Sequence, residues 1–424
     1  MPTPSRRSNR FSPPGSWMSS QRRQIIFVWN YVQWGGAQMY FIAIIKQAKP
    51  DWDVVVILPR NSSPDMIGFL KQLNVRYEFL ELAIDASAAP SIAQKLSRQW
   101  KRIRSELEVN RYLRKFDLRE NILHIETAPW QSWILLASLS RRGANIFLTM
   151  HNFMPRTSKL REAIWKARMQ FVSRLRGMHI IASNRDTKNR MKGWVSAAFW
   201  ENVTVAHTAI DPTQIDAARL TSEEASTIRR RHSIPDNKTV VLAVGQFVDR
   251  KGRWVFLEAA AEVLRSDSDV YFVWLTPKLP DADDRAHIDS YGINSSFKIV
   301  LSETLGCERL DVLKFFNIAH IFALPSYIEG LPIALLEAMA IGVPAISTNV
   351  FAIPEAVRHM ETGLLIEAGD ARQLADSIIM LKKDHALRQR LSESGRAFVV
   401  ENFDERDAAR KCLDAYMECF ADGR

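Results

Sequence analysis

The stretch PSYIEGLPIALLEAMAIGVPAISTN, residues 325–349, decides the fold of this chain. An apolar run ends at Pro325, a short loop follows, and a run of helical composition extends from Pro332 to just before Gly342. Proline suits the first turn of a helix because its missing N–H needs no partner there, and glycine suits the residue after the last turn. Pro344 opens another apolar run. The stretch predicts a strand, a helix and a second strand, with free backbone N–H groups at the helix start that suit a diphosphate.

Short apolar runs of the same kind recur along the chain, and helical patterns separate most of them. This alternation is typical of a parallel sheet covered on both faces. The series is interrupted by the polar and charged residues 211–237, which we expect to be a linker. We therefore predict an α/β protein with two doubly wound, Rossmann-like domains facing a central cleft. The runs are residues 24–29, 53–58, 121–125, 145–150, 178–183, 239–245, 270–275, 297–301, 321–325, 344–348 and 363–366.

The boundaries follow from the same pattern. The predicted N-terminal domain covers residues 22–210, and the predicted C-terminal domain covers residues 238–402. Residues 403–424 have the spacing of an amphipathic helix. Residues 1–21 are basic and rich in Ser and Pro, and no apolar stretch follows their paired arginines, so we expect a disordered tail.

The net charge of +10 is unevenly distributed. Residues 1–210 hold 32 Lys and Arg against 14 Asp and Glu, whereas the remainder is mildly acidic. A basic half indicates an anionic partner, such as a phosphorylated lipid, a membrane surface or a nucleic acid. Because the chain has no nucleic-acid-binding motif and no repeated aromatic–basic pattern, we expect no nucleic acid partner.

A membrane surface is the anionic partner that the sequence favours. Three cysteines make no disulfide framework, and no apolar stretch is long and uncharged enough to span a bilayer. We therefore expect a cytoplasmic protein, peripheral on the inner face of the cytoplasmic membrane. Residues 157–176 carry six basic residues against one acid. At helical spacing this segment has an apolar face, formed by Leu160, Ile164, Phe171, Val172 and Leu175. The predicted membrane or acceptor contacts are Lys159, Arg161, Lys166 and Arg168.

Glu329 and Glu337 give residues 325–349 a more specific meaning. The whole string closely resembles the E-x7-E signature of the retaining glycosyltransferases of family 4, which have the GT-B fold. This resemblance implies that the C-terminal helix returns to the first domain. It also implies an enzyme of the hexosyltransferase type, which moves a sugar with retention from a nucleotide-sugar donor to a polysaccharide or lipid-linked saccharide. The resemblance continues in residues 244–252, 353–357 and 362–378.

The same resemblance implies a role for each matching residue. The predicted catalytic residues are Glu329, which faces the donor sugar near the reacting carbon, and His151, which reaches that sugar from the first domain. Glu337 accepts hydrogen bonds from the ribose, and Lys251 neutralises the diphosphate. The other predicted donor contacts are the backbone of Gly330, Leu331, Pro332 and Ile333, the close-approach glycines Gly35 and Gly36, and Gln246.

Charge development explains why these groups suit the reaction. Breaking a glycosyl phosphate bond builds positive charge on the sugar and negative charge on the diphosphate. A carboxylate near the first and a cation near the second stabilise both. Enzymes of this family generally work without a bound metal, so we expect no metal and no cofactor. The chain departs from the family pattern at Gln246, where an Arg usually binds phosphate, so we expect one fixed cation instead of two.

Two alternatives stay open. Other GT-B proteins, such as nucleotide-sugar epimerases, share the two-domain framework. A non-catalytic protein can also bind anions through the basic N-terminal half. The combination of Lys251 with Glu329 and Glu337 favours the transferase.

Overall fold

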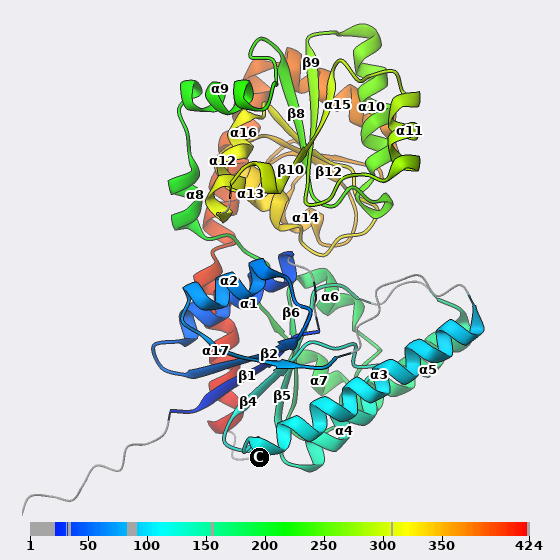
Figure 1. Cartoon of the computed structure of the whole chain (residues 1–424), viewed down its shortest axis with the longest axis vertical. Helices are drawn as coiled ribbons and strands as arrows, with labels where there is room; N and C mark the ends of the chain where they lie inside the picture. The colour runs from blue at the N-terminus through cyan, green and yellow to red at the C-terminus, as the bar shows by residue number, and fades with distance from the viewer. Residues whose placement is uncertain are drawn as a thin grey trace, which may run out of the picture.

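The structure, a computed structural model, describes residues 22–30, 32, 35–82, 91–153, 157–306 and 308–421. The expected tail of residues 1–21 lies outside this range. Two α/β domains follow one another along the long axis of the molecule, and the last helix runs from the second domain back along the first (Figure 1). The resemblance-based prediction for that helix is therefore confirmed.

Within the described residues, the first domain holds a seven-stranded sheet in the order β3-β2-β1-β4-β5-β6-β7, and all its pairings are parallel. The order reverses between β1 and β4, so the loops after these strands open a crevice at the carboxyl edge of the sheet. The strands are β1 (Gln24–Val28), β2 (Asp53–Pro59), β3 (Arg76–Leu80), β4 (Ile122–Ile125), β5 (Asn145–Met150), β6 (Met178–Ala182) and β7 (Thr204–Val205).

The described part of the second domain holds a six-stranded parallel sheet in the order β10-β9-β8-β11-β12-β13. Its order reverses between β8 and β11, which places the loops after those strands side by side. The strands are β8 (Thr239–Val244), β9 (Val270–Thr276), β10 (Phe297–Leu301), β11 (Ile321–Leu324), β12 (Ala345–Thr348) and β13 (Leu364–Ile366).

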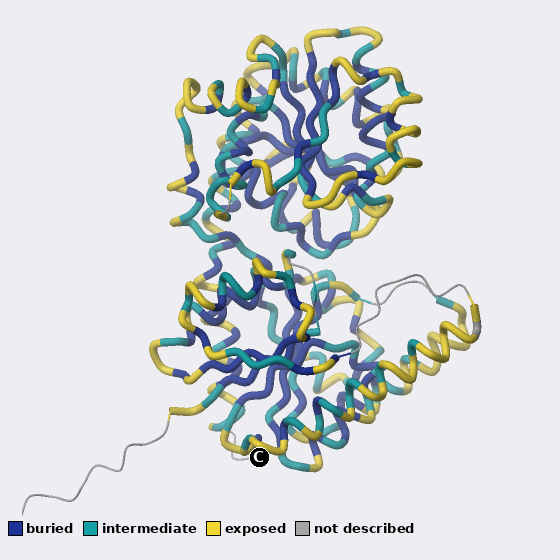
Figure 2. Tube along the Cα trace, viewed as in Figure 1, coloured by how far each residue is buried: buried dark blue, intermediate teal, exposed yellow. Residues whose placement is uncertain are grey.

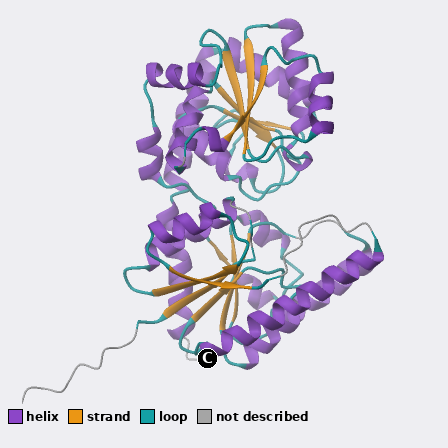
Figure 3. Ribbon diagram, viewed as in Figure 1, coloured by secondary structure: helices purple, strands orange, loops and turns teal. Residues whose placement is uncertain are grey.

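Helices cover both sheets (Figure 3). Those before the second sheet are α1 (Gly36–Ala48), α2 (Pro64–Gln72), α3 (Ile92–Tyr112), η1 (Leu113–Lys115), α4 (Trp133–Arg141), α5 (Lys159–Val172), α6 (Arg185–Arg190), α7 (Ala197–Glu201), α8 (Pro212–Ala218) and α9 (Ser222–Arg231). The later ones are η2 (Asp249–Lys251), α10 (Arg253–Ser266), α11 (Ala282–Ser290), η3 (Ser302–Thr304), α12 (Arg309–Phe315), η4 (Phe316–Ile318), α13 (Ile333–Ile341), α14 (Ile353–Ala356), α15 (Ala371–Lys383), α16 (His385–Asn402) and α17 (Glu405–Ala421). Among the described residues, no helix combines the length and apolar composition needed to cross a bilayer.

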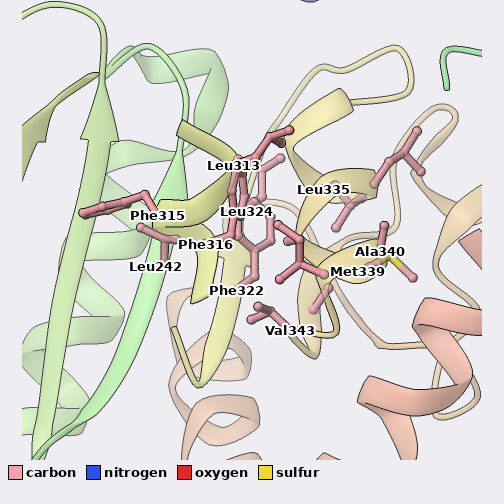
Figure 4. Close-up of a cluster of buried hydrophobic side chains, with 14 of the residues drawn as sticks. Leu242, Leu313, Phe315, Phe316, Phe322, Leu324, Leu335, Met339, Ala340 and Val343 are labelled. Atoms are coloured by element: carbon pink, nitrogen blue, oxygen red, sulfur yellow. The ribbon is translucent and has the colours of Figure 1, made fainter. Parts of the chain in front are cut away.

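The sheets are buried between their helical layers, as the dark interior of each domain shows (Figure 2). Helix α13, which belongs to residues 325–349, lies in the core of the second domain and is buried along most of its length. Leu335 and Met339 of α13 belong to one cluster with Phe316, Phe322 and Leu324 (Figure 4). Glu337 therefore projects from an otherwise apolar helix, which is costly unless the carboxylate has a partner.

The expected linker of residues 211–237 is mostly helical. It forms α8 and α9, each capped by the side chain of the residue before it. Ile215, Ala218 and Ile234 are buried in the core of the second domain. Charged residues dominate this segment and favour a linker, but a few apolar residues at helical spacing are enough to attach it to the second domain.

The chain passes between the two domains twice, near Ile210 and near Phe403, and these two crossing segments lie against each other. Ile210 donates its N–H to Phe403 O (2.9 Å), and Glu405 donates its N–H to Ile210 O (2.8 Å). Lys46 of α1 forms ion pairs at 2.9 Å with both Asp211 and Glu405. One cation of the first domain thus holds both crossing segments.

The predicted apolar face on residues 157–176 is wrong in part. Val172 is buried in the core of the first domain, and Leu175 packs against that core. Leu160, Ile164 and Phe171 instead point outward and are exposed. The helix therefore has two apolar sides: an inner one that attaches it and an outer one that is uncovered.

Candidate functional site

The predicted donor residues of the second domain lie where the strand order reverses. Lys251 follows β8 through η2, and Glu329 follows β11 in the loop that leads into α13. Helix α13 begins at Ile333 with Pro332 as its N-cap, which has no side-chain capping bond. Pro332 is expected in the first turn of this helix, but it lies one residue before that turn. Gly342 adopts the left-handed conformation (φ 102°) that ends the helix, as expected.

Lys251 and Glu329 form an ion pair. Both side chains are largely buried, with exposed fractions of 12% and 8%. Ser326, which is fully buried, donates a hydrogen bond to Glu329 Oε1 at 3.0 Å. A buried carboxylate held by a cation and a hydroxyl keeps its orientation. The structure therefore brings together two residues with complementary expected roles. The resemblance implies that Glu329 faces the donor sugar and that Lys251 neutralises the diphosphate.

Gly252 makes this pairing possible. Its backbone is left-handed (φ 71°), and a Cβ atom there would lie 1.9 Å from the carbonyl oxygen of Pro325. Only glycine lets the loop after β8 touch the end of β11. The Lys-Gly pair at 251–252 thus combines a cation with the close approach that positions it.

The two domains meet at the same point. A Cβ on Gly330 would lie 2.5 Å from His151 O and 3.0 Å from Asn152 Oδ1, so the loop before α13 lies directly against the loop after β5. At Gly36 a Cβ would lie 3.6 Å from Ile333 Cγ2, an ordinary contact. Gly36, Gly330, His151 and Ile333 are therefore neighbours across the domain boundary. Gly35 precedes α1 as its N-cap in an extended conformation that any residue adopts.

His151 is partly buried beside aromatic rings. Its ring meets Tyr40 and Phe41 edge-on, with centroid distances of 5.4 and 6.0 Å. Burial lowers its pKa to about 4, so the imidazole is neutral near pH 7. Its Nε2 atom is buried and has no hydrogen-bond partner among the described residues. The hydrogen-bonding capacity of this neutral imidazole nitrogen is therefore unused within the described residues.

Glu337 has a partner that sequence reasoning missed. Arg309, the first residue of α12, forms an ion pair with Glu337. Burial lowers the pKa of Arg309 to about 10, which still leaves the guanidinium charged near pH 7. The pair lines a small pocket with Ala209 and Asp211 of the first crossing segment. Arg309 lies outside every motif, so no pattern in the chain indicates it.

The remaining predicted donor contacts divide into two groups. Leu331 and Pro332 are buried behind the loop, so their backbone, not their side chains, is what a ligand can reach. Gln246 is exposed, and its Oε1 accepts a hydrogen bond from Arg250 Nη2 at 3.4 Å. The Arg250 guanidinium therefore lies next to Gln246, the position at which the family usually has an Arg.

Glu355 joins the two domains and was not among the predicted site residues. It accepts hydrogen bonds from the backbone N–H groups of Arg185 (3.0 Å) and Asp186 (2.8 Å), at the start of α6. His207 Nε2 lies 3.0 Å from the same carboxylate. Burial alone would raise the pKa of Glu355, but these three contacts lower it below its ordinary value.

The predicted membrane or acceptor residues lie away from this site, on α5. Lys159, Arg161 and Lys166 are exposed. Arg168 is partly buried and donates to Trp130 O at 3.3 Å, so part of its role is structural. In the described part of the chain, no three His, Cys, Asp or Glu side chains gather in a way that could hold a metal ion.

Solved structures with the same architecture define the class of fold. A glycosyltransferase from Rickettsia africae ESF-5 superposes with a TM-score of 0.73, at 17% identity, over 94% of this chain and 99% of that one. Anabaena Alr3699/HepE, solved in complex with UDP-glucose, gives a TM-score of 0.72 at 16% identity, over 93% and 99% of the two chains. The fold is GT-B, as predicted.

Similarity to a known family lies in the second domain. Residues 224–398 match the family model described as glycosyl transferases group 1. The lipopolysaccharide core biosynthesis glycosyltransferase LpsE of Rhizobium meliloti (strain 1021) is 30% identical over 193 residues, which are 46% of this chain and 53% of that protein. The N-acetyl-alpha-D-glucosaminyl L-malate synthase of Bacillus anthracis is 35% identical over 114 residues, 27% of this chain and 30% of that one. This chain thus spans about half or less of these two relatives. The match of residues 224–398 to the glycosyl transferases group 1 model confirms the resemblance within the second domain.

Proposed function

We propose that this protein is a retaining glycosyltransferase of the hexosyltransferase type. It transfers a sugar from a nucleotide-sugar donor to a polysaccharide or lipid-linked saccharide. The observation that carries the proposal is the buried Lys251–Glu329 pair beside the start of α13, where the loops after β8 and β11 meet. The family of the second domain supports the same reaction class.

The donor's diphosphate suits the positive side of this arrangement. The start of α13 directs backbone N–H groups toward the cleft, and Lys251 adds a full charge. Glu337 is placed in the second turn of the same helix, where it can accept hydrogen bonds from ribose hydroxyls while Arg309 holds its other side. The nucleotide therefore lies along α13.

The transfer step follows from this placement. The bond between the anomeric carbon and the diphosphate oxygen breaks, and its electron pair leaves with the diphosphate, whose charge Lys251 and the α13 amides stabilise. The acceptor hydroxyl oxygen bonds to the same carbon, on the face that the diphosphate leaves, and its proton passes to the departing diphosphate oxygen. Glu329 stabilises the positive charge that develops on the sugar, and His151 positions a sugar hydroxyl from the opposite domain.

The acceptor meets the first domain, whose basic surface supports an acceptor presented by an anionic membrane. Lys159, Arg161 and Lys166 extend from α5 into solvent and are available for such a contact. The protein needs no bound metal or cofactor in this proposal, because Lys251 and the helix amides supply the positive charge.

Turnover of nucleotide sugars by the purified full chain tests this function. We expect Glu329→Ala to lower kcat about 100-fold or more with a much smaller change in KM, because Glu329 acts chiefly on the charged transition state. Glu329→Gln, which keeps a hydrogen-bond acceptor for Ser326, should lose nearly as much. The exposed Glu401→Gln serves as the matched control. NMR of the product reports the anomeric configuration, and an inverted product or an unchanged kcat in Glu329→Ala contradicts the proposal.

A further inference from the structure

Exposed apolar side chains gather on three helices of the first domain. Among the residues that the structure describes, fourteen large apolar side chains are exposed, and eight of them belong to α3, α4 and α5. Single exposed apolar residues are ordinary, but a contiguous group marks an interaction surface. Helices α3 and α5 form an arm that extends from the first domain, and much of its surface is exposed (Figures 1 and 2).

Helix α3 has its apolar stripe on the outside. Leu96, Trp100, Ile103 and Leu107 are exposed, Trp100 to 71%. At about 100° per residue they share an arc of about 60°. This stripe, called the α3 stripe below, is as narrow as a coiled-coil seam and runs about three turns.

The side of α3 that faces the protein is polar by comparison. Arg102 donates to Gln131 Oε1 at 2.7 Å, and Glu106 accepts from Ser132 Oγ at 2.7 Å. Asn110 Nδ2 donates to Ser138 Oγ at 3.0 Å. An ordinary surface helix buries its apolar face and exposes its polar one. Apart from Val109, which is buried in the core of the first domain, α3 does the reverse along these turns, so its stripe is available to a partner.

The stripe continues onto the neighbouring helices. Leu160, Ile164 and Phe171 form an exposed row along α5, and Ile134 at the start of α4 is 63% exposed. The ring of Phe171 contacts Trp133 edge-on at 5.7 Å, which joins α5 to α4. Residues 130–133 contact both α3 and α5. The three helices therefore form one surface.

Basic residues surround these apolar rows. Helices α3 and α5 together hold ten Lys and Arg against three Glu. Next to the α3 stripe stand Lys95 and Arg104, and next to the α5 row stand Lys159 and Arg161. All four side chains are exposed. Long basic side chains can bury their methylene stems while their charged ends stay at a polar boundary.

We propose that α3, the start of α4, and α5 form a surface that docks on an anionic lipid bilayer, with the apolar rows at the acyl boundary and the basic residues among the headgroups. Helices that lie in an interface combine an apolar row containing Trp or Phe with flanking Lys and Arg, as these do. Anionic lipid complements the positive excess. The docking itself does not depend on the proposed function. Only the reason for docking, an acceptor presented by the membrane, rests on that function.

The direct test is co-sedimentation of the full chain with vesicles of phosphatidylcholine, with and without phosphatidylglycerol. We expect binding only to vesicles that contain phosphatidylglycerol, and weaker binding as NaCl increases, because salt screens exposed charges. Leu96→Ser/Trp100→Ser/Leu107→Ser should weaken binding to these vesicles at least about tenfold. Lys159→Ser/Arg161→Ser/Lys166→Ser should abolish the preference for vesicles that contain phosphatidylglycerol over vesicles that do not. Arg168 is left unchanged because it contacts Trp130 O.

The matched control is Leu279→Ser/Met380→Ser, which removes two exposed apolar residues from the second domain. It should bind vesicles like the wild type, and all variants should keep the wild-type affinity for nucleoside diphosphates. Wild-type binding by the α3 stripe variant overturns the proposal, as does equal binding to both kinds of vesicle. A wild-type dimer that the stripe variant converts to a monomer, with no vesicle binding, assigns the surface to a second copy instead. Vesicle binding without sugar transfer overturns only the proposed function.

Discussion

Glu337 lies on an apolar helix, where an ion pair with one guanidinium stabilises its carboxylate. The carboxylate is nearly buried, and Arg309 pairs with it from α12. Removing one member of a buried pair leaves the other charge without a partner, which is costly. The residue that is proposed to bind the nucleotide therefore depends on a residue that need not touch the nucleotide at all.

We predict that Glu337→Ala weakens the binding of nucleoside diphosphates at least about tenfold, since hydrogen bonds to a charged group are worth about 1.5–3 kcal/mol. Glu337→Gln keeps an acceptor for Arg309 and should fold normally while still binding more weakly than the wild type. Isothermal titration with UDP, GDP and ADP measures the affinity, and thermal unfolding separates a binding loss from a folding loss. Unchanged affinity in both variants, for whichever nucleotide binds, contradicts the role of Glu337.

The sequence indicates individual candidate site residues where a motif contains them. Glu329, Glu337 and Lys251 belong to contiguous strings whose spacing has meaning, and the structure brings Glu329 and Lys251 into contact. Arg309 and Ser326 could not be assigned a role, because each acts through a contact and carries no spacing of its own. His151 was predicted from a loose match, and its contact with Gly330 is visible only when both domains are present.

Helices α6 and α14 join the two domains through Glu355. We predict that Glu355→Ala leaves the amides of Arg185 and Asp186 without an acceptor and lets the domains separate. The expected results are a larger radius of gyration by small-angle X-ray scattering and a donor KM raised about tenfold, because the halves of the site no longer meet. Glu361→Ala, an exposed change a few residues away, is the control. An unchanged radius of gyration and KM in Glu355→Ala would rule out this role.

Elements were predictable where a strand is buried on both faces. Each of the eleven apolar runs overlaps a strand of the structure. The two strands that were missed lie at the edges of the first sheet. In β3, RYEFL, charged residues alternate with aromatic ones and the strand is only partly buried, while β7 has two residues. Edge strands need less apolar surface, so hydrophobicity alone does not reveal them.

For the whole molecule, three histidines predict how stability depends on pH. Burial lowers the pKa of His124 to about 3, and burial is also the main reason that the pKa values of His151 and His320 fall to about 4. In the unfolded chain a histidine takes up its proton near pH 6.5. Between these values the unfolded state binds more protons, so stability is full above about pH 6.5 and falls as the pH decreases toward 4.

Thermal unfolding from pH 7.5 to pH 4.5 measures this effect, and we expect the melting temperature to fall across the range. His320 Nδ1 accepts a hydrogen bond from Val240 N (2.9 Å), which an Asn side chain can replace. His320→Asn should therefore reduce the acid loss, while His385→Gln, at an exposed position, should not. A melting temperature that does not change over this range would show that the histidines protonate without cost.

Helix α17 has a consequence for how the protein is made. Its Ala409, Cys412 and Tyr416 complete the apolar cluster that contains Phe41 and Ile45 of α1. A ribosome releases the sheet of the first domain early, but it produces α17 only after the entire second domain. Throughout that interval the nascent first domain presents an uncovered apolar face. The domain that is translated first is therefore the one whose folding is completed last.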